Sequence, residues 1–302
     1  MAQDREYRVE SSCTLLAYLI GLPIGLSRKA AKDLLRFRTV TVRRTADLRR
    51  DRDNVKHDTK LEPGDVVTIA ARQPARDIVP ELQGLRIVHL DDAIVVVDKP
   101  AGLLSMGSER EKQRTAHRIL NDHLKALTKS PLQQAFIVHR LDRETSGLMV
   151  FARTEASQSA LQQNWKRVTK KYLAVVQGVP ANAHGTLKNN LLEDKSLRVR
   201  WVDQGGEIAI THYRVLRKHG NRSLLELTLE TGRKHQIRVQ LAALGHPIAG
   251  DRKYGAQSDP APRLGLHSCE LEFGHPVSGA SMHFRSALPA PILALIERPR
   301  SR

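Results

Sequence analysis

The chain has 302 residues, a length that allows two domains, each able to bury a hydrophobic core. Its 49 Lys and Arg exceed its 32 Asp and Glu, which gives a net charge of +17, with +6 over residues 1–76 and +11 over the rest. A positive charge that is spread along the whole chain predicts a polyanionic partner, with nucleic acid ahead of an anionic membrane. The two cysteines, far apart in sequence, exclude a disulfide framework and a zinc site built from Cys pairs.

Residues 12–37 have the apolar spacing of two helices. The first helix has an apolar face formed by Leu15, Leu16, Leu19 and Ile20. This pattern ends at Gly21, and the whole apolar run 14–26 is too short to cross a bilayer, so no membrane segment is expected. Ser27 is the expected N-cap of a second helix over 28–37. The outward face of that helix would carry Arg28, Lys29, Lys32, Arg36 and Arg38.

Two β-like runs rich in branched residues follow, at 39–44 and 65–71. Prolines and a glycine then mark a break in composition before the first strong strand, which begins at Leu85. We therefore expect a small helix-and-hairpin domain over 1–73, a linker over 74–84 and a main domain over 85–302.

The main domain consists of strand-like runs separated by short turns. The runs are 85–92, 93–100, 135–141, 146–152, 171–178, 211–218, 223–230 and, with mixed character, 235–244. One helix is expected over 155–167, with Thr154 as its N-cap. Strands joined by short turns, with helices inserted between some of them, predict an α+β fold with a mixed, mostly antiparallel sheet.

A carboxylate on a loop between two apolar strands is the first candidate for chemistry. The segment HRLDRETSGLMV, residues 139–150, places Asp142 at the rim of the sheet, where a rigid scaffold can aim a side chain into a cleft. From the residues alone, Asp142 is either a turn former or a catalytic group. The string HRLD also occurs in kinase catalytic loops, but the sequence lacks the glycine-rich loop and the DFG motif that a kinase needs.

A basic segment and a tyrosine are the other candidates. Four cationic or titratable residues stand within six positions, namely Arg233, Lys234, His235 and Arg238. If residues 235–239 are extended, Arg238 and His235 point to opposite faces. The segment is then either a basic surface strand or the source of a cation, Arg238, that keeps Asp142 ionised. Tyr172 either packs in the core or faces a base in the pocket.

Together these segments resemble the RluA-type RNA pseudouridine synthases. The motifs that carry the resemblance occur in the order of that family, and they are VVDKPAGLL (96–104), HRLDRETSGLMVFART (139–154), KKYLAVVQG (170–178), ETGRKHQIRV (230–239), GHPIAGDRKYG (245–255) and RLGLHSCELEF (263–273). The resemblance runs from about Leu85 to about Ala290. The residues before it resemble the S-four-type RNA-binding domain, with two helices followed by TVTVRR and LEPGDVVTIA.

The resemblance implies an enzyme that isomerises uridine to pseudouridine in RNA. It makes Asp142 the catalytic aspartate, Tyr172 the active-site tyrosine and Arg238 the arginine that pairs with the aspartate. Residues expected to shape the loop or bind substrate are His139, Arg140, Thr145, Arg233 and His235. In the N-terminal domain, the residues expected to bind RNA are Arg28, Lys29 and Lys32.

The same resemblance sets the expected partners. The reaction has no net redox change and adds no atoms, so no cofactor and no metal are expected. The partner is RNA, with large-subunit ribosomal RNA ahead of transfer RNA. The protein is expected to be a cytoplasmic monomer.

Two positions depart from the usual pattern of the family, and two other functions stay open. Residues 105–108 read SMGS where the family often has His-Pro, and Gln240 stands where it often has His. Both departures are expected to affect substrate fit. The first alternative function is a non-catalytic RNA-binding or ribosome-assembly factor. The second is a hydrolase that releases the free base, which needs a second acid, and the acid nearest to Asp142 is Glu144.

Overall fold

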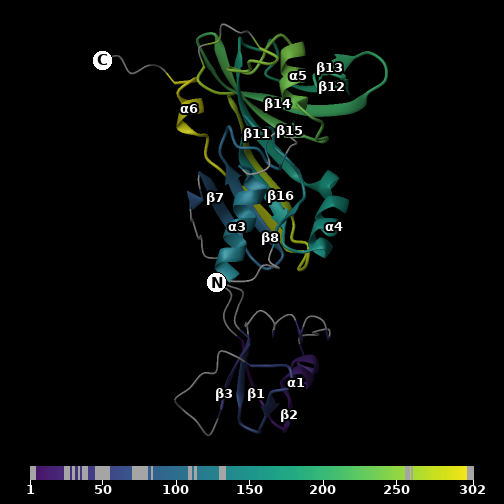
Figure 1. Ribbon diagram of the computed structural model, residues 1–302, viewed down its shortest axis with the longest axis vertical. Coiled ribbons are helices and arrows are strands. Elements are labelled where there is room, and N and C mark those ends of the chain that lie inside the picture. Colours follow the sequence, from purple (N-terminus) through teal and green to yellow (C-terminus); the bar gives the residue numbers. More distant parts are fainter. Residues whose placement is uncertain are drawn as a thin grey trace, which may run out of the picture. The chain divides into compact units, whose positions relative to one another are not determined.

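The computed structural model describes two compact units, Met1–Arg76 and Asp77–Arg302 (Figure 1). The described residues are 5–23, 28, 31, 32, 35, 40–44, 55–69, 81, 82, 84–107, 111, 114–128, 134–255, 259 and 261–297. Within these residues, no helix combines the length and the apolar character needed to cross a membrane. Most of the expected linker at 74–84 lies outside the described residues, so its bounds stay a prediction.

The first unit packs helix α1 against a small antiparallel sheet. Its elements are β1 (Arg5–Arg8), β2 (Cys13–Thr14), α1 (Leu15–Gly21), β3 (Val40–Arg43), β4 (Lys60–Leu61) and β5 (Val66–Ile69), with β1, β5 and β3 adjacent in that order. The hydroxyl of Thr14 caps α1 by accepting the N–H of Ala17 at 3.4 Å. Leu15 and Leu19 are buried as expected, but Ile20 is 39% exposed, so the apolar face is narrower than its spacing predicted.

The expected second helix is described only in part. Arg28, Ala31, Lys32 and Leu35 are helical, and their burial separates the two faces of the helix. Ala31 and Leu35 are buried, while Arg28 and Lys32 are exposed. The expected N-cap Ser27 and the expected RNA-binding Lys29 lie outside the described residues.

The second unit is built around one twelve-stranded sheet. Its elements are β6 (Glu81–Leu82), β7 (Leu85–Leu90), β8 (Ile94–Lys99), α3 (Ala116–Thr128), β9 (Phe136–Ile137), β10 (Ser146–Ala152), α4 (Glu155–Gln163), the 3-10 turn η1 (Trp165–Arg167), β11 (Thr169–Gln177), β12 (His184–Glu193), β13 (Val199–Val202), β14 (Glu207–His219), β15 (Arg222–Leu229), α5 (Gln236–Ala243), β16 (Leu266–Gly274), β17 (Ser281–Arg285) and α6 (Ala290–Leu293).

The strand order of this sheet is β13-β12-β14-β15-β11-β16-β10-β8-β7-β6, with β17 beside β16 and β9 beside β10. The described strand pairs are antiparallel except for β10 and β16, which run parallel through Ser146–His267 and Gly147–Ser268. The predicted α+β class with a mixed, mostly antiparallel sheet is confirmed. The parallel pair matters for the site, because it fixes the start of β10 directly after the Asp142 loop.

Helices cover the central strands on both faces (Figure 1). On one face, Leu120 and Leu124 of α3 pack in the same cluster as Val95 and Val97 of β8. On the other face, Leu161 of α4 packs with the alternate residues of β8 and β10. Strand β10 is buried along its whole length, which explains its unbroken apolar run. The loop that precedes β10 is therefore attached to the most rigid part of the unit.

Two expectations for this unit need correction. Residues 236–243 form the helix α5 and are not extended, and this helix buries polar and apolar side chains together, among them Gln236, Arg238 and Gln240. Ile and Val favoured a strand there, but packing over β12 and β13 overrides that weak preference. Helix α4 ends at Gln163, and the rest of the expected helix is the turn η1. Helix α3 and the β12–β13 hairpin were not predicted.

Gly147 allows β10 and β16 to approach closely, and Gly147→Ala should destabilise the second unit. Its φ of +115° is strained for other residues, and an added Cβ would lie 2.2 Å from the carbonyl oxygen of Ser268. Backbone strain and the forced shift each cost about 1–3 kcal/mol. The expected loss in unfolding free energy is measured by urea denaturation. Gly102→Ala is the control, since Gly102 has φ +84° but open space around it. Equal losses in both variants would contradict the close-approach explanation.

Candidate active site

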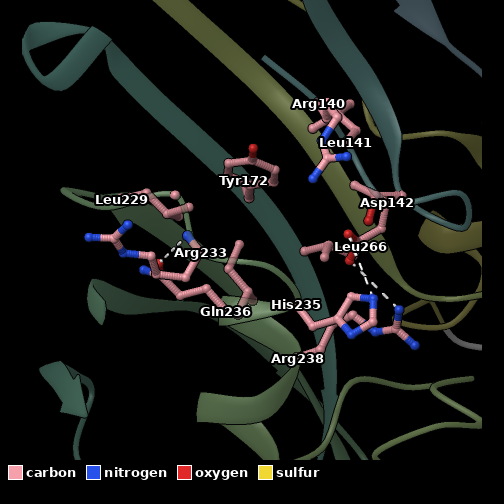
Figure 2. Close-up of a pocket in the computed structure, with 13 residues that line it drawn as sticks. Arg140, Leu141, Asp142, Tyr172, Leu229, Arg233, His235, Gln236, Arg238 and Leu266 are labelled. Atoms are coloured by element: carbon pink, nitrogen blue, oxygen red, sulfur yellow. Dashed lines mark hydrogen bonds and ion pairs between the residues drawn. The ribbon is translucent and has the colours of Figure 1, made fainter. Parts of the chain in front are cut away.

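The candidate site is a small inner pocket that opens into a wider outer groove. The inner pocket, about 80 Å³, is lined by Arg140, Leu141, Asp142, Thr145, Tyr172, Leu229, Gly232, Arg233, His235, Gln236, Ile237, Arg238 and Leu266. The outer groove, about 740 Å³, shares nine of these residues, Asp142 among them. Figure 2 shows Asp142, His235 and Arg238 together at one end of the inner pocket, with Arg233 at the other.

A tight turn presents Asp142 at the boundary between pocket and groove. The N–H of Thr145 donates to the carbonyl of Asp142 at 3.2 Å, and Thr145 is buried below the turn. The Asp142 side chain keeps 27% of its exposure. The turn continues directly into β10, so a rigid strand sets the position of the carboxylate. The sequence left open whether Asp142 is a turn former or a catalytic group; the structure places it in a turn whose side chain lines a pocket, and the catalytic role stays a prediction.

The segment that follows β8 supports this turn from below. The Ser105 hydroxyl accepts the N–H of Leu141 at 3.0 Å and donates to the carbonyl of the same residue at 2.6 Å. The N–H of Gly102 donates to the carbonyl of Arg143 at 2.8 Å. Ser105 is the first residue of the SMGS departure, and its hydroxyl holds the backbone next to Asp142. Its role is therefore support of the turn, besides any effect on substrate fit.

A buried lysine adds a second support. The ammonium group of Lys99 donates to the carbonyls of Pro100 at 3.0 Å, Leu103 at 2.8 Å and Arg143 at 3.2 Å. The Lys99 side chain is fully buried, and burial lowers its pKa to about 7, against the opposing attraction of Asp142. Lys99 thus ties the end of β8 to the turn that carries Asp142.

Arg238 contacts three carboxylates and binds one of them far more closely than the others. Its Nε and Nη2 donate to the two oxygens of Asp251, both at 2.8 Å. Its distances to Glu144 and Asp142 are 3.2 Å and 3.7 Å. Burial alone would lower the pKa of Arg238, but the hydrogen bonds and charge of Asp251 raise it above its ordinary value. The expected pairing of Arg238 with Asp142 is present, but Asp251 is the main partner.

Asp251 is an anchor that holds the guanidinium in place. Its side chain is fully buried and also accepts the N–H groups of Lys253 and Tyr254, each at 3.0 Å. Burial raises the pKa of Asp251, but the bonds from Arg238 outweigh this and hold the pKa below its ordinary value. A bidentate pair with a fixed partner leaves Arg238 little freedom to rotate. The Nη1 group that faces Asp142 is therefore held at a set position.

His235 contacts Asp142 from the start of α5. It adopts the left-handed conformation with φ of +54°, which is uncommon outside glycine. Its Nδ1 lies 2.7 Å from the hydroxyl of Tyr254, and that hydroxyl already accepts the N–H of Val199 at 3.2 Å. We assign the tautomer in which the Tyr254 hydroxyl donates to Nδ1 and Nε2 carries the proton, and this Nε2 lies 3.9 Å from Asp142. Burial lowers the pKa of His235, which favours this neutral form.

Tyr172 lies in strand β11 and lines both the pocket and the groove. It is 9% exposed and belongs to the main hydrophobic core, as the first of the two readings expected. That its ring faces a base stays a prediction. Burial raises the pKa of Tyr172, and its hydrogen bonding with Ser268 opposes this only in part. The phenol is neutral at ordinary pH and offers a ring and a hydroxyl to whatever fills the pocket.

The other expected binding residues differ in how free they are. Arg140 is exposed, and its Nη1 lies 3.7 Å from the sulfur of Met106. Arg233 is held by Glu207 at 2.6 Å and by the carbonyl of Ile208 at 3.2 Å. Arg140 can therefore reach a ligand in the groove more freely than Arg233.

His139 is held by contacts with other parts of the second unit. Its ring stacks on Trp165 with centroids 4.4 Å apart, and its Nε2 accepts the N–H of Val150 at 3.1 Å. Burial lowers the pKa of His139 to about 3, with the charge of Lys170 acting in the same direction. Because Nε2 accepts a backbone N–H, the neutral imidazole of His139 supports the loop. His139 nonetheless lines the outer groove, so its role toward substrate stays a prediction.

Three residues that build the site lie in the motifs of the sequence, but the sequence did not indicate their function. Asp251 and Tyr254 belong to GHPIAGDRKYG, and Lys99 belongs to VVDKPAGLL. Only their partners, which are distant in sequence, reveal what they do. Gln240, in contrast, was expected to affect substrate fit but does not line the pocket or the groove. Its side-chain amide is hydrogen-bonded to Thr211 at 2.7 Å and to the carbonyl of Ala209 at 3.0 Å. Its expected effect on substrate fit is not supported by this geometry.

Arg28 and Lys32 belong to the first unit, and both side chains are exposed. Lys32 lines a groove of about 370 Å³ with Leu35, Val55, Lys56 and His57. No acidic side chain is among the described residues of that lining. The expected RNA-binding role of Arg28 and Lys32 stays a prediction.

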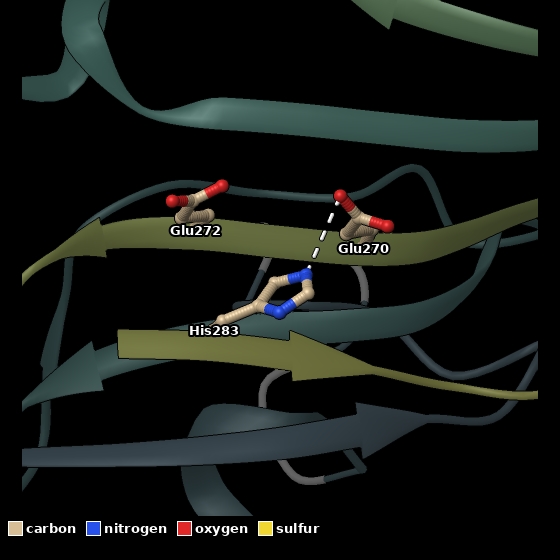
Figure 3. Close-up of side chains that lie close together, drawn as sticks. All are labelled: Glu270, Glu272 and His283. Atoms are coloured by element: carbon tan, nitrogen blue, oxygen red, sulfur yellow. Dashed lines mark ion pairs between the residues drawn. The ribbon is translucent and has the colours of Figure 1, made fainter. Parts of the chain in front are cut away.

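One group of side chains in the described part of the chain has the composition of a metal site. Glu270 and Glu272 of β16 lie beside His283 of β17 (Figure 3). Glu270, however, is already paired with Lys171 at 3.0 Å and Arg285 at 3.1 Å. These two cations neutralise the carboxylate that a metal would need, so we assign no metal here. That the protein needs no metal stays a prediction.

Comparisons with known proteins agree on one family. A family model described as RNA pseudouridylate synthase matches residues 93–243. The uncharacterized RNA pseudouridine synthase YlyB of Bacillus subtilis is 36% identical over 252 residues, which is 82% of this chain and 83% of that protein. The ribosomal large subunit pseudouridine synthase D of Nitrosomonas europaea is 38% identical over 256 residues, covering 80% and 74%. The human RNA pseudouridylate synthase domain containing 4 has a TM-score of 0.58 at 28% identity, covering 68% of this chain and 90% of that one.

Removal of Arg238 should destabilise the second unit mainly through Asp251. Arg238→Met leaves a fully buried carboxylate without its partner, which costs about 3–5 kcal/mol of unfolding free energy. Adding Asp251→Asn should restore most of this loss in urea denaturation. Adding Asp142→Asn instead should restore little, because Asp142 is 27% exposed and water can solvate it. Recovery with Asp142→Asn and not with Asp251→Asn would contradict the anchor role of Asp251.

Proposed function

Because the chain belongs to the RNA pseudouridylate synthase family, whose members are isomerases, we propose that it converts specific uridines of structured RNA to pseudouridine with Asp142 as the catalytic carboxylate. The family and the enzyme class inferred from the motif order are confirmed by the matches. The observation that carries the residue assignment is the position of Asp142, which is partly exposed where the inner pocket opens and faces a guanidinium with a fixed anchor.

The reaction balances without an added reactant. The bond from the ribose carbon to a ring nitrogen breaks, the base turns, and a bond from the same ribose carbon to a ring carbon forms. That ring carbon loses its proton, and the freed nitrogen gains one. A carboxylate can form and release a covalent bond to the sugar or to the base during these steps. Either route uses an ionised Asp142 beside the target nucleotide.

Arg238 and His235 keep the carboxylate ready for this role. Asp251 fixes Arg238, and the Nη1 of Arg238 lies 3.7 Å from Asp142, so the carboxylate has a cation beside it that cannot swing away. The Nε2–H of His235 lies 3.9 Å from the other oxygen. Both distances leave room for the carboxylate to move toward a ligand. The pair therefore attracts Asp142 without holding it in a short ion pair.

Tyr172 supplies the surface on which the base rests. Its phenol stays neutral because burial raises its pKa, so it does not start as a phenolate base. Leu229 and Leu266 line the same pocket and exclude water around the base while it turns. Packing against the base is therefore the role we assign to Tyr172, ahead of direct proton removal.

We infer that the substrate is large-subunit ribosomal RNA, with transfer RNA second. The relative from Nitrosomonas europaea carries the large ribosomal subunit in its name. The first unit, which we propose to be an S-four-type RNA-binding domain, offers Arg28 and Lys32 as exposed cations. A paired uridine must leave its stack to reach the pocket, which costs on the order of a few kcal/mol. Phosphate contacts by the basic surface offset that cost.

Asp142→Asn should fold and bind RNA but form no product. The amide keeps the size of the side chain but is no nucleophile, so pseudouridine formation should fall by at least about a thousandfold. The measurement is pseudouridine content of RNA after incubation with each variant, with RNA binding measured in parallel. Asp203→Asn is the control, because Asp203 is exposed and lies outside the pocket. Turnover near wild type in Asp142→Asn would refute the assignment.

The same incubation separates the alternative functions. A hydrolase would release free uracil, whereas an isomerase releases none and a binding protein changes nothing. Mapping pseudouridines in total cellular RNA with and without the gene would identify the substrate. Sites lost from transfer RNA would overturn the ribosomal assignment, and no lost sites would favour the binding protein.

Arg28→Gln combined with Lys32→Gln should weaken RNA binding in a salt-dependent way. Each lost phosphate contact lowers the slope of log Kd against log salt by about 0.7–0.9. The Kd should rise at low salt, and the difference from wild type should shrink as salt increases. The matched control is Arg118→Gln with Lys125→Gln, two exposed cations of α3. If both pairs behave alike, the first unit has no special role in RNA binding.

A further inference from the structure

A second groove, of about 420 Å³, lies between strand β13 and helix α5, which lie side by side in Figure 1. It is lined by Arg198, Val199, Arg200, Trp201, Val239, Ala242, Ala243 and Tyr254. None of these residues lines the inner pocket or the outer groove around Asp142. It is therefore a separate surface of the second unit.

An exposed tryptophan forms one wall of this groove. Val199 and Trp201 alternate onto the same face of β13, the face that α5 covers. Val239 of α5 packs over Val199, which is 3% exposed. One turn later the helix carries only Ala242 and Ala243, and Trp201 is 53% exposed. The small side chains leave a hollow beside a large aromatic ring, and an exposed ring of this kind commonly marks a binding surface.

The charge of the groove favours an anionic occupant. Arg198 and Arg200 are both exposed, and none of the described residues that line the groove is acidic. Arg198 is held over the ring of Tyr254, 5.8 Å from its centroid, and donates to the carbonyl of Lys253 at 3.0 Å. Arg200 is 67% exposed and reaches Asp194 at 3.2 Å. A groove whose lining combines an exposed aromatic ring with two guanidinium groups has the chemistry that binds a base together with its phosphates.

We propose that this groove binds an unpaired nucleotide of the RNA substrate, with the base stacked on Trp201 and the neighbouring phosphates at Arg198 and Arg200. The proposal rests on the proposed function, since it takes RNA as the substrate. It adds a contact outside the catalytic pocket that would select RNAs with an unpaired nucleotide at a set distance from the target. A protein segment is the rival occupant, but the two arginines and the lack of acidic lining favour RNA.

Tyr254 links the groove to the active site. Its hydroxyl accepts the N–H of Val199 at 3.2 Å and contacts His235 at 2.7 Å, and His235 lies 3.9 Å from Asp142. The hairpin is also tied to the loop before α5 by the ion pair between Glu193 and Lys234. A nucleotide on Trp201 would therefore sit at a fixed position relative to Asp142. The groove would thus favour RNAs in which an unpaired base lies at a fixed distance from the target uridine.

The test follows the fluorescence of Trp201 during titration with a short single-stranded oligouridylate. The chain has two tryptophans, so Trp165→Phe leaves Trp201 as the only reporter. Stacking should quench the emission. The Kd of the variants, which lack this reporter, is measured by filter binding. Trp201→Ala should raise it about 5- to 150-fold, while Trp201→Phe should retain most of the affinity because a ring remains. Leu197→Ala is the control, because Leu197 is 63% exposed on the same hairpin but does not line the groove.

Unchanged fluorescence together with an unchanged Kd in Trp201→Ala would overturn the proposal, whether or not a protein partner is later found on that surface. Pseudouridine formation by the wild type is measured separately. If the wild type forms product and Trp201→Ala binds and reacts as the wild type does, the groove proposal fails and the proposed function stands. If the wild type forms none, the proposed function fails, and the titration still decides whether the groove binds RNA.

Discussion

The buried ion pair between Arg238 and Asp251 is the constraint on which the site depends. A guanidinium that is 5% exposed is stable only with a partner, and Asp251 supplies two hydrogen bonds of 2.8 Å from a fully buried position. Because Asp251 holds the guanidinium through two hydrogen bonds, Arg238 faces Asp142 from a fixed direction and at 3.7 Å, a longer distance than to Asp251. The site therefore combines a rigid cation with a carboxylate that keeps its freedom to move.

The other half of the site depends on a different support. The turn that carries Asp142 is held from below by Lys99 and Ser105, both of which bind its backbone and not its side chains. The turn then enters β10, a strand buried along its whole length. The backbone of this turn and the guanidinium of Arg238 thus belong to two elements, each held by contacts within the chain. Little reorganisation is needed when a nucleotide enters, which is how preorganised sites lower a barrier.

The arrangement also explains why the binding surfaces lie where they do. The long hairpin of β12 and β13 is at the end of the sheet, and Tyr254 connects it to His235. Tyr254 thus relates the groove beside Trp201 to the start of α5. The first unit carries Arg28 and Lys32 as exposed cations. In the function that we propose, these residues bind RNA while the chemistry takes place at Asp142.

The sequence by itself determined the family and the α+β class, because these depend on local motifs and composition. It also proposed Asp142, Tyr172 and Arg238 as site residues, and the structure brings these three side chains to one pocket. It did not determine that 236–243 is a helix, since branched residues favour strands locally while burial against β12 and β13 decides the outcome. Nor did it show that Asp251 anchors Arg238, that Lys99 ties the turn, or that Trp201 borders a groove. Each of these roles depends on a partner distant in sequence, and only the tertiary structure brings such partners together.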